Sequence, residues 1–508
     1  MAIFFKRNNL RRVNWISIFK VQGALLLLEG ALMLLTMIVC AIYDDRSLDL
    51  SQLDNPQYGF TALFVSAMIV IAVGIIPFVF YNEKVRSLGK REGVLIIVMG
   101  WLTITLGGCL PFLFSDVTPD FTDAFFESMS GFTSTGASVI DDLESISRGI
   151  LFWRSVISWF GGMGIIIIIM FVAMIPSLGI SSFMLYTAES TGVFKTHPRL
   201  KETARGLFAV YLALTVLCAF ALYLCGLSPY DAIAHSFTTI STCGFSTFNS
   251  SVMLFTPSMQ YVIIFFMIIS SMSFNSLYFI LSFKFKKKNL ISEESKAFLV
   301  IIAVATLYIF VSLMLSQYNN GDPASKVFRD SLMEVVCTLT TTGFSSVNYL
   351  LWPSHIWFVL FLLFFIGGCS GSTAGGVKIV RYIILVKNSF TEMKRQIHPQ
   401  AVMPVRYNRE AVPQSNIYSI HAFFILYILV FIAGALAFAM MGLDFETSIG
   451  ISIASLANVG PGIGAIGPDS TYSFLPDIGK WLSVILQFLG RLELFIVLII
   501  FNKSFWVK

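Results

Sequence analysis

The sequence predicts an all-α, polytopic membrane protein with a two-span N-terminal hairpin followed by four span–pore helix–span repeats around a single pore. Two features of composition support a membrane protein. Of the 508 residues, 56% are hydrophobic and 12% are charged, whereas soluble domains carry ~25% charged residues. The third observation is a short motif of hydroxyl residues and glycine that recurs four times between long apolar stretches. Together these observations predict about ten full spans and four re-entrant pore loops.

Ten apolar stretches are long enough to cross ~30 Å of hydrocarbon. They are residues 16–43, 60–81, 93–115, 152–176, 205–227, 256–283, 296–317, 355–386, 417–442 and 478–501. If the N-terminus is inside, the inside segments hold 24 of the 34 Lys and Arg residues. Because cytoplasmic loops are enriched in Lys and Arg, both termini are predicted to be cytoplasmic.

The recurring motif reads GFTSTGAS at 131–138, TISTCGFST at 239–247, TLTTTGFSS at 338–346 and, in a degraded form, SLANVGPGI at 455–463. Thirteen residues before the central glycine of each copy lies a residue of N-cap type: Asp123, Asp231, Asp330 or Thr447. Each copy therefore predicts a short helix that begins near the outer surface and ends at the glycine loop. Non-helical backbone at membrane depth is tolerated only where protein or a water-filled space surrounds it, so four such loops predict a pore.

Four converging loops of this kind would favour a cation. Helix C-termini carry partial negative charge, and glycine permits the positive φ that turns successive carbonyl groups to one side. Rings of carbonyl oxygens can replace the water around K⁺. A single Ser/Thr-Gly cluster is ordinarily a turn, but four copies in register favour a repeated functional unit.

These residues resemble the TrkH, KtrB and HKT superfamily of potassium transport proteins, most closely its TrkH branch. The resemblance rests on WFGGMGIIIIIMFVAMIPSLGISSFMLYTAESTG (159–192), DAIAHSFTTISTCGFST (231–247), GGCSGSTAGGVKIVR (367–381), NVGPGIG (458–464) and GRLELFIVLIIFNKSFW (490–506). It implies a homodimer of four-unit pores that works with a cytosolic, nucleotide-binding regulatory ring of the TrkA or KtrA kind. No cofactor is expected on this chain, and K⁺ is the expected transported ion.

The resemblance places the selectivity filter in four loops of one chain, at 133–137, 241–245, 340–344 and 457–461. The K⁺-binding residues are then Ser134, Thr135, Gly136, Thr242, Cys243, Gly244, Thr341, Thr342, Gly343, Asn458, Val459 and Gly460. Plant relatives that prefer Na⁺ carry Ser at the first filter glycine, so glycine at all four positions points to K⁺. Each loop has one filter glycine where tetrameric K⁺ channels have two, which predicts fewer backbone rings and moderate selectivity over Na⁺.

A gate is expected below the filter. The stretch GGCSGSTAGG (367–376) has five glycines in ten residues and should break its helix in mid-membrane. The resemblance implies an intramembrane loop there that obstructs the pore, with Gly371, Gly375 and Gly376 in the loop and Arg491 on the pore axis. The alternative for Arg491 is a structural ion pair with Glu334 or Glu127, because a charge inside a span is costly by ~2.5 kcal/mol or more unless it is paired or solvated.

The repeats divide the chain into a hairpin and four pore units. The expected boundaries are 1–92 for the N-terminal two-span hairpin, 93–204 for pore unit 1, 205–295 for unit 2, 296–416 for unit 3 with the gate loop, and 417–508 for unit 4. The basic loops 284–296 and 387–413 are candidates to contact the regulatory ring or anionic membrane lipid. The expected location is the bacterial inner membrane, and the net charge of +5 requires no nucleic acid.

Other classes of function fit the sequence less well. The histidines are scattered and no catalytic triad or transition-metal motif is found, so no enzyme is expected. A secondary carrier for a small solute would show inverted repeats, whereas these repeats are parallel because every glycine loop falls on the external side. A sodium-coupled, KtrB-like potassium transporter remains the main alternative. The sequence leaves open whether K⁺ flow is passive or is a symport coupled to H⁺ or Na⁺.

Overall fold

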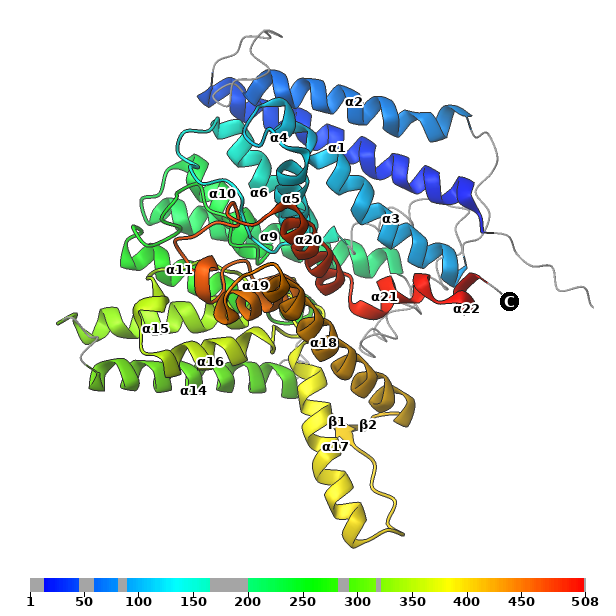
Figure 1. Cartoon of the computed structure of the whole chain (residues 1–508), viewed down its shortest axis with the longest axis vertical. Coiled ribbons are helices and arrows are strands. Elements are labelled where there is room, and N and C mark those ends of the chain that lie inside the picture. Colours follow the sequence, from blue (N-terminus) through cyan, green and yellow to red (C-terminus); the bar gives the residue numbers. More distant parts are fainter. Residues whose placement is uncertain are drawn as a thin grey trace, which may run out of the picture.

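The computed structural model describes residues 13–44, 59–80, 89–164, 200–281, 292–316 and 321–506. Helices dominate these ranges, and one short hairpin pairs β1 (Arg406–Tyr407) antiparallel with β2 (Glu410–Ala411). Figure 1 shows the helices gathered into one body, from which α17 (Ile379–Ile397) extends with the β-hairpin beside it. The predicted all-α fold is confirmed.

The N-terminal hairpin consists of α1 (Trp15–Tyr43) and α2 (Gly59–Phe80), which pack along their lengths. Small residues bring the two backbones close together. A Cβ atom built at Gly23 of α1 would lie 2.6 Å from the carbonyl oxygen of Gly74 of α2. Close approach of this kind is how helices associate in lipid, where the hydrophobic effect does not hold them together. The other side of α1 packs on α3 (Lys90–Gly108), which links the hairpin to the rest of the molecule.

The same order of elements, a first helix, a short helix, a loop and a further helix, occurs four times in the described ranges. The first unit has α3, α4 (Leu110–Phe114), α5 (Phe121–Phe132) and α6 (Arg148–Gly162), and the second has α9 (Leu200–Leu224), α10 (Pro229–Ile240), α11 (Pro257–Ser270) and α12 (Phe274–Leu281). The third has α14 (Glu293–Leu315), α15 (Ala324–Leu339), η3 (Tyr349–Leu351), α16 (Ser354–Phe364) and α17. The fourth has α18 (Gln414–Met440), α19 (Phe445–Ala457), η4 (Gly464–Ile466), α20 (Asp477–Arg491), α21 (Leu494–Leu498), η5 (Ile499–Phe501) and α22 (Lys503–Trp506).

The four short helices that precede the glycine loops are α5, α10, α15 and α19. They begin at other residues than predicted, because their N-caps are Asp120, Ser228, Pro323 and Asp444. The N-cap assignment of Asp123, Asp231, Asp330 and Thr447 is therefore wrong. Asp123, Asp231 and Thr447 lie in the first turn, where the two carboxylates still interact favourably with the helix dipole. Asp330 lies further inside α15. At the N-cap of α19, hydrogen bonds from Thr447 lower the pKa of the Asp444 carboxyl.

The second span is broken rather than continuous in units two, three and four, and in unit one its described part ends shortly after α6. Helix α6 ends at Gly162, residues 271–273 separate α11 from α12, and residues 365–378 separate α16 from α17. In the fourth unit α20 and α21 meet at an angle of 110°. The predicted spans 256–283 and 478–501 are therefore not single helices, because apolar length alone does not reveal a break. The span 355–386 is interrupted at the glycine-rich stretch 367–376, where the sequence predicted a break. The end of the predicted span 152–176 lies outside the described residues.

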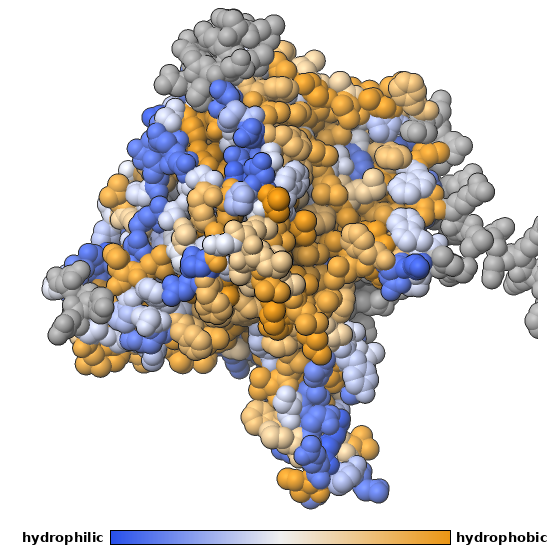
Figure 2. All heavy atoms as spheres, viewed as in Figure 1, coloured by the Kyte–Doolittle hydropathy of each residue, from blue (hydrophilic) through white to orange (hydrophobic). Residues whose placement is uncertain are grey.

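Six helices in the described ranges are long and apolar enough to cross a membrane, or seven if the bent α20–α21 pair counts as one span. Their outer faces expose large apolar side chains, among them Val300, Val304 and Leu307 of α14. Figure 2 shows hydrophobic residues over most of the visible surface, with hydrophilic ones gathered along one edge and on the protruding α17. An apolar surface of this extent is stable in lipid and not in water, and the chain is a multi-pass membrane protein.

Candidate functional site

The four glycine loops meet one another in a closed ring. A Cβ atom built at Gly136 would overlap the carbonyl oxygen of Cys243, one at Gly244 would overlap that of Thr342, and one at Gly343 would overlap that of Val459. The circle closes at Gly460, where a Cβ atom would lie 2.6 Å from the carbonyl oxygen of Thr135. Each glycine therefore leaves room for the carbonyl group of the next unit, in the order one, two, three, four and back to one.

The backbone of the four loops follows one pattern. The glycines Gly136, Gly244, Gly343 and Gly460 have φ between +79° and +91°. The residue two positions before each glycine, Ser134, Thr242, Thr341 or Asn458, also has positive φ, between +53° and +57°. In each loop, two residues in the left-handed conformation flank one residue with an ordinary backbone conformation. This alternation turns consecutive carbonyl groups toward the same side. A left-handed conformation costs a non-glycine residue about 1–2 kcal/mol, so the packing of the ring must hold these residues in place.

The side chains next to the ring bond within and between the loops. The Thr133 and Thr135 hydroxyls lie 2.7 Å apart, and the Thr340 and Thr342 hydroxyls repeat this pair at 2.7 Å in the third unit. Asn458 Nδ2 donates to the Thr135 hydroxyl at 2.9 Å, which ties the fourth loop to the first. These hydroxyls therefore hold the loops together, and the backbone carbonyls remain the oxygens best placed to contact an ion.

Three buried side chains next to the ring were not predicted from the sequence. Nine residues before the ring glycines Gly136, Gly244 and Gly343 lie Glu127, His235 and Glu334, all buried. Glu127 accepts the Val139 N–H at 3.1 Å, Glu334 accepts the Ser346 N–H at 2.9 Å, and His235 Nε2 lies 3.1 Å from the Ser246 hydroxyl. Each side chain thus fixes the chain just after its glycine. The constant spacing of nine residues was the signal that could have found them.

The ring is also fixed by a buried ion pair. Arg154 Nε of α6 lies 2.7 Å from Glu127 Oε1 of α5, and the Arg154 guanidinium also reaches the Ser246 carbonyl oxygen of the second unit at 3.3 Å. The Arg154 Cζ atom lies 4.1 Å from the centre of the Phe245 ring. A buried carboxylate is tolerated when paired and hydrogen-bonded in this way. Glu127 is therefore engaged by Arg154 and is not the partner of Arg491.

The 367–376 loop lies directly against the ring on the side of the short helices' C-termini. The Gly375 N–H donates to the Thr341 hydroxyl at 2.6 Å, and the Gly376 N–H donates to the Ala457 carbonyl oxygen at 3.1 Å. The Thr373 hydroxyl donates to the Ile240 carbonyl oxygen at 3.0 Å. Bonds to units two, three and four place this loop across the end of the ring. Gly371 and Gly376 have φ of +72°, which glycine adopts without a Cβ penalty.

Two cations hold the 367–376 loop by its carbonyl groups. Arg491 donates to the Thr373 carbonyl oxygen at 2.9 Å and to the Gly161 carbonyl oxygen of the first unit at 2.8 Å. Lys378 donates to the Ala374 carbonyl oxygen. Among the described residues no carboxylate lies within ion-pair distance of Arg491, so the alternative considered for it, an ion pair with Glu127 or Glu334, is wrong. The role of Lys378 was missed because only its place within an apolar stretch was visible in the sequence.

All twelve predicted filter residues therefore belong to one ring, and the four predicted gate residues lie on or against one loop beside it. No group of three His, Cys, Asp or Glu side chains suited to a metal ion occurs in the described ranges.

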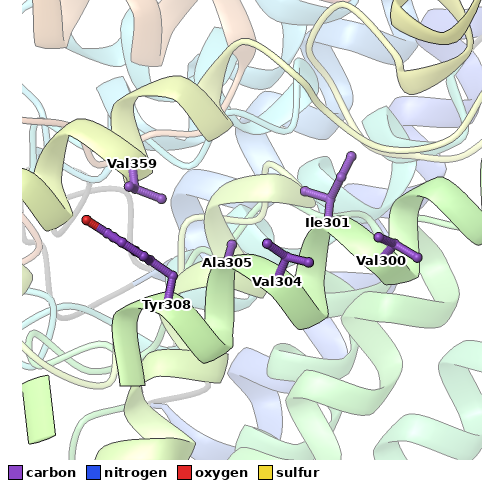
Figure 3. A pocket seen from close by; sticks show the side chains of 6 residues that line it. All are labelled: Val300, Ile301, Val304, Ala305, Tyr308 and Val359. Atoms are coloured by element: carbon purple, nitrogen blue, oxygen red, sulfur yellow. The ribbon is translucent and has the colours of Figure 1, made fainter. Parts of the chain in front are cut away.

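A separate groove of about 420 Å³ on the outer face is lined by Val300, Ile301, Val304, Ala305, Tyr308 and Val359 of α14 and α16 (Figure 3). Its apolar lining offers no ligand for a cation and suits contact with lipid.

The family follows from this architecture together with comparisons to known proteins. A sequence profile for the family described as TrkH, cation transport protein, matches residues 60–506. The chain belongs to the TrkH family. It is 36% identical to the Trk system potassium uptake protein TrkH of Salmonella typhimurium, over 96% of this chain and 99% of that protein. It is 35% identical to TrkH of Vibrio parahaemolyticus, again over 96% of this chain and 99% of that protein.

A solved TrkH structure has the same fold. The crystal structure of the potassium transporter TrkH from Vibrio parahaemolyticus matches with a TM-score of 0.84 and 32% identity, covering 97% of this chain and 100% of that one. The resemblance to the TrkH branch that was seen in the sequence is confirmed. TrkH proteins are transport proteins, so the prediction that the chain is not an enzyme is also confirmed.

Proposed function

We propose that this TrkH family member conducts K⁺ into the cell through the ring formed by the four glycine loops. The carbonyl oxygens of Thr135, Cys243, Thr342 and Val459, each beside the glycine of the preceding unit in the ring, are the proposed ligands. The closed ring of four contacts carries the proposal. The names of the relatives support K⁺ as the ion, because each is called a Trk system potassium uptake protein.

The short helices support a cation at this place. Helices α5, α10, α15 and α19 end immediately before the ring, at Phe132, Ile240, Leu339 and Ala457. The partial negative charge of four helix C-termini lowers the energy of a positive ion between them. Three filter glycines, Gly136, Gly244 and Gly343, are only partly buried, which fits a path open to water from one side.

The 367–376 loop is the proposed gate. It is bonded across the ring by Gly375, Gly376 and Thr373 and held by Arg491. The loop has to move before an ion can pass, and the positive charge of Arg491 adds a barrier to a cation at short range. The proposed units keep the boundaries 1–92, 93–204, 205–295, 296–416 and 417–508.

The proposed setting is the inner membrane, with both termini in the cytoplasm, a homodimer as the transporting form and a nucleotide-binding ring as its cytosolic regulator. The 387–413 segment is a proposed contact for that ring. The lysines of the other proposed contact, Lys286, Lys287 and Lys288, lie outside the described residues.

Ion flux in proteoliposomes tests the proposed function. Purified protein is reconstituted with an imposed K⁺ gradient, and uptake of radioactive Rb⁺ is measured in the presence of competing K⁺ or Na⁺. We expect uptake that exceeds that of empty vesicles and is suppressed by K⁺ at lower concentration than by Na⁺. Repeating the measurement with and without pH and Na⁺ gradients separates passive flow from coupled transport. Equal competition by K⁺ and Na⁺ would contradict a K⁺-selective ring.

A further inference from the structure

Glu294 lies at the start of α14 and is buried, with 3% of its surface exposed. It belongs to the first turn, which Ser292 caps through its hydroxyl at 3.1 Å from the Ser295 N–H. An acidic residue there is favourable for the helix dipole, but that interaction does not require burial. The buried carboxylate also makes hydrogen bonds to the 367–376 loop, to α17 and to the 405–412 hairpin.

One oxygen of this carboxylate holds the 367–376 loop. Glu294 Oε1 accepts the Ser370 N–H at 2.6 Å, within the loop, and the Val380 N–H at 3.2 Å, in the first turn of α17. A single oxygen atom therefore connects the loop to the helix that follows it. A hydrogen bond to a charged acceptor contributes more than a neutral one, so this contact favours the position of the loop against the ring.

The other oxygen faces the 405–412 hairpin, which contains β1 and β2. The Tyr407 hydroxyl donates to Glu294 Oε2 at 3.4 Å. The neighbouring Glu293 binds the same hairpin, since its N–H donates to Asn408 Oδ1 at 3.0 Å. Lys387 of α17 pairs with the Glu293 carboxylate and donates to the Arg406 carbonyl oxygen at 3.0 Å. The hairpin is thus docked on the start of α14.

The docked hairpin also has its own apolar contact with α17. Val405 is buried against Val380 and Ile384, together with Ile417 of α18. Val380 is the residue whose N–H binds Glu294, so the apolar contact and the carboxylate contact act on the same turn of α17. Displacing the hairpin would remove the Tyr407 hydrogen bond and loosen that turn at once.

We propose that Glu294 is a positioning residue that couples the 405–412 hairpin to the 367–376 loop, so that the docked hairpin keeps the loop against the ring. A protein that binds the hairpin from the cytoplasm and displaces it would release the loop. This inference rests on the proposed role of the loop as the gate. Through Glu294, displacement of the hairpin by a partner outside the membrane would release the 367–376 loop inside it.

The test uses Tyr407→Phe, which removes the hydroxyl bonded to Glu294 and leaves the Ser370 and Val380 contacts in place. Rb⁺ flux per folded protein should rise about 2- to 10-fold, the range for losing one hydrogen bond from the docked state. Glu294→Gln should raise flux at least as much, and adding Tyr407→Phe to it should have no further effect. Tyr418→Phe is the matched control, because Tyr418 is 66% exposed on α18, and its flux should equal that of the parent.

Thermal stability and the yield of folded protein are measured for every variant, because a purely structural Glu294 would lower both and leave flux per folded protein unchanged. Multiplicative effects of Tyr407→Phe and Glu294→Gln would also overturn the coupling, since the two residues would then act independently. Arg491→Ala serves as a reference for the gate itself. If it raises flux and the other two variants do not, the coupling is wrong and the gate stands; if none of the three raises flux, the proposed gate is wrong as well.

Discussion

Replacement of Arg491 by alanine is the sharpest test of the proposed gate. The guanidinium donates to the Thr373 carbonyl oxygen of the 367–376 loop and to the Gly161 carbonyl oxygen of α6. Both acceptors are neutral carbonyl groups, so removing the arginine leaves no buried carboxylate without its partner. We therefore expect Arg491→Ala to fold with near-parental yield while the loop loses a connection to the opposite side of the pore.

The expected magnitude follows from the contact between Arg491 and the loop. Only the bond to Thr373 joins Arg491 to the loop, and a hydrogen bond to a charged group contributes about 1.5–3 kcal/mol. Because about 1.4 kcal/mol changes an equilibrium tenfold, its loss shifts the balance between docked and released loop by about 10- to 100-fold. Removing the positive charge also lowers the barrier for a cation. Rb⁺ flux without any regulator should rise by at least about tenfold.

The assay is Rb⁺ flux into proteoliposomes, normalised to folded protein, beside a thermal unfolding curve. Arg491→Lys is the matched control, because it keeps the charge but replaces the two-armed guanidinium by a single ammonium group. Its flux should lie between those of the parent and Arg491→Ala. Unchanged or lower flux for Arg491→Ala at full yield would refute the role of Arg491 in closing the pore.

Three further changes test separate parts of the structure. Gly136→Ser should lower the K⁺ over Na⁺ flux ratio, because its Cβ overlaps the Cys243 carbonyl oxygen at a φ of +79°; Gly442→Ser, at a φ of +91° with open space around it, controls for backbone strain and should keep the parental ratio. Gly375→Ala should raise basal flux, because the new methyl group overlaps the Ala457 carbonyl oxygen and disfavours the docked loop; parental flux would contradict that docking. Glu29→Leu should raise stability by about 1–3 kcal/mol, measured by thermal unfolding, because both carboxyl oxygens are buried without a hydrogen-bond partner among the described residues; a loss of stability would indicate a partner for Glu29.

The sequence predicted the membrane fold and the place of the glycine loops well, because both are visible as patterns among residues close together in the chain. Apolar runs report contact with lipid, and a constant spacing of thirteen residues to each glycine reports a repeated unit. The left-handed conformation of Gly136 was expected, because glycine adopts positive φ readily. The left-handed conformation of Ser134 was not expected, because serine ordinarily avoids it and the packing of the ring holds it there.

Other features could not be predicted because they depend on contacts between distant residues. Arg491 was given Glu127 or Glu334 as a possible partner on grounds of charge, yet Arg154 and the Ser346 N–H occupy those carboxylates. The breaks between α11 and α12 and between α20 and α21 are invisible to hydropathy, because the short helices on either side remain apolar, whereas five glycines revealed the break at 367–376. The starts of α5, α10 and α19 were misplaced by three residues, because residues such as Asp and Thr occur both at the N-cap and in the first turn. The start of α15 was misplaced by seven residues.

The central claim is that the four loops form a cation site from backbone carbonyls. The most direct measurement is an experimental structure of the protein in Rb⁺, with the ion located by its anomalous scattering. We predict Rb⁺ within the ring formed by the carbonyl oxygens of Thr135, Cys243, Thr342 and Val459, replaceable by K⁺ and lost in Gly136→Ser. Well-ordered loops with no ion in the ring, or Rb⁺ bound elsewhere in the protein, would contradict it.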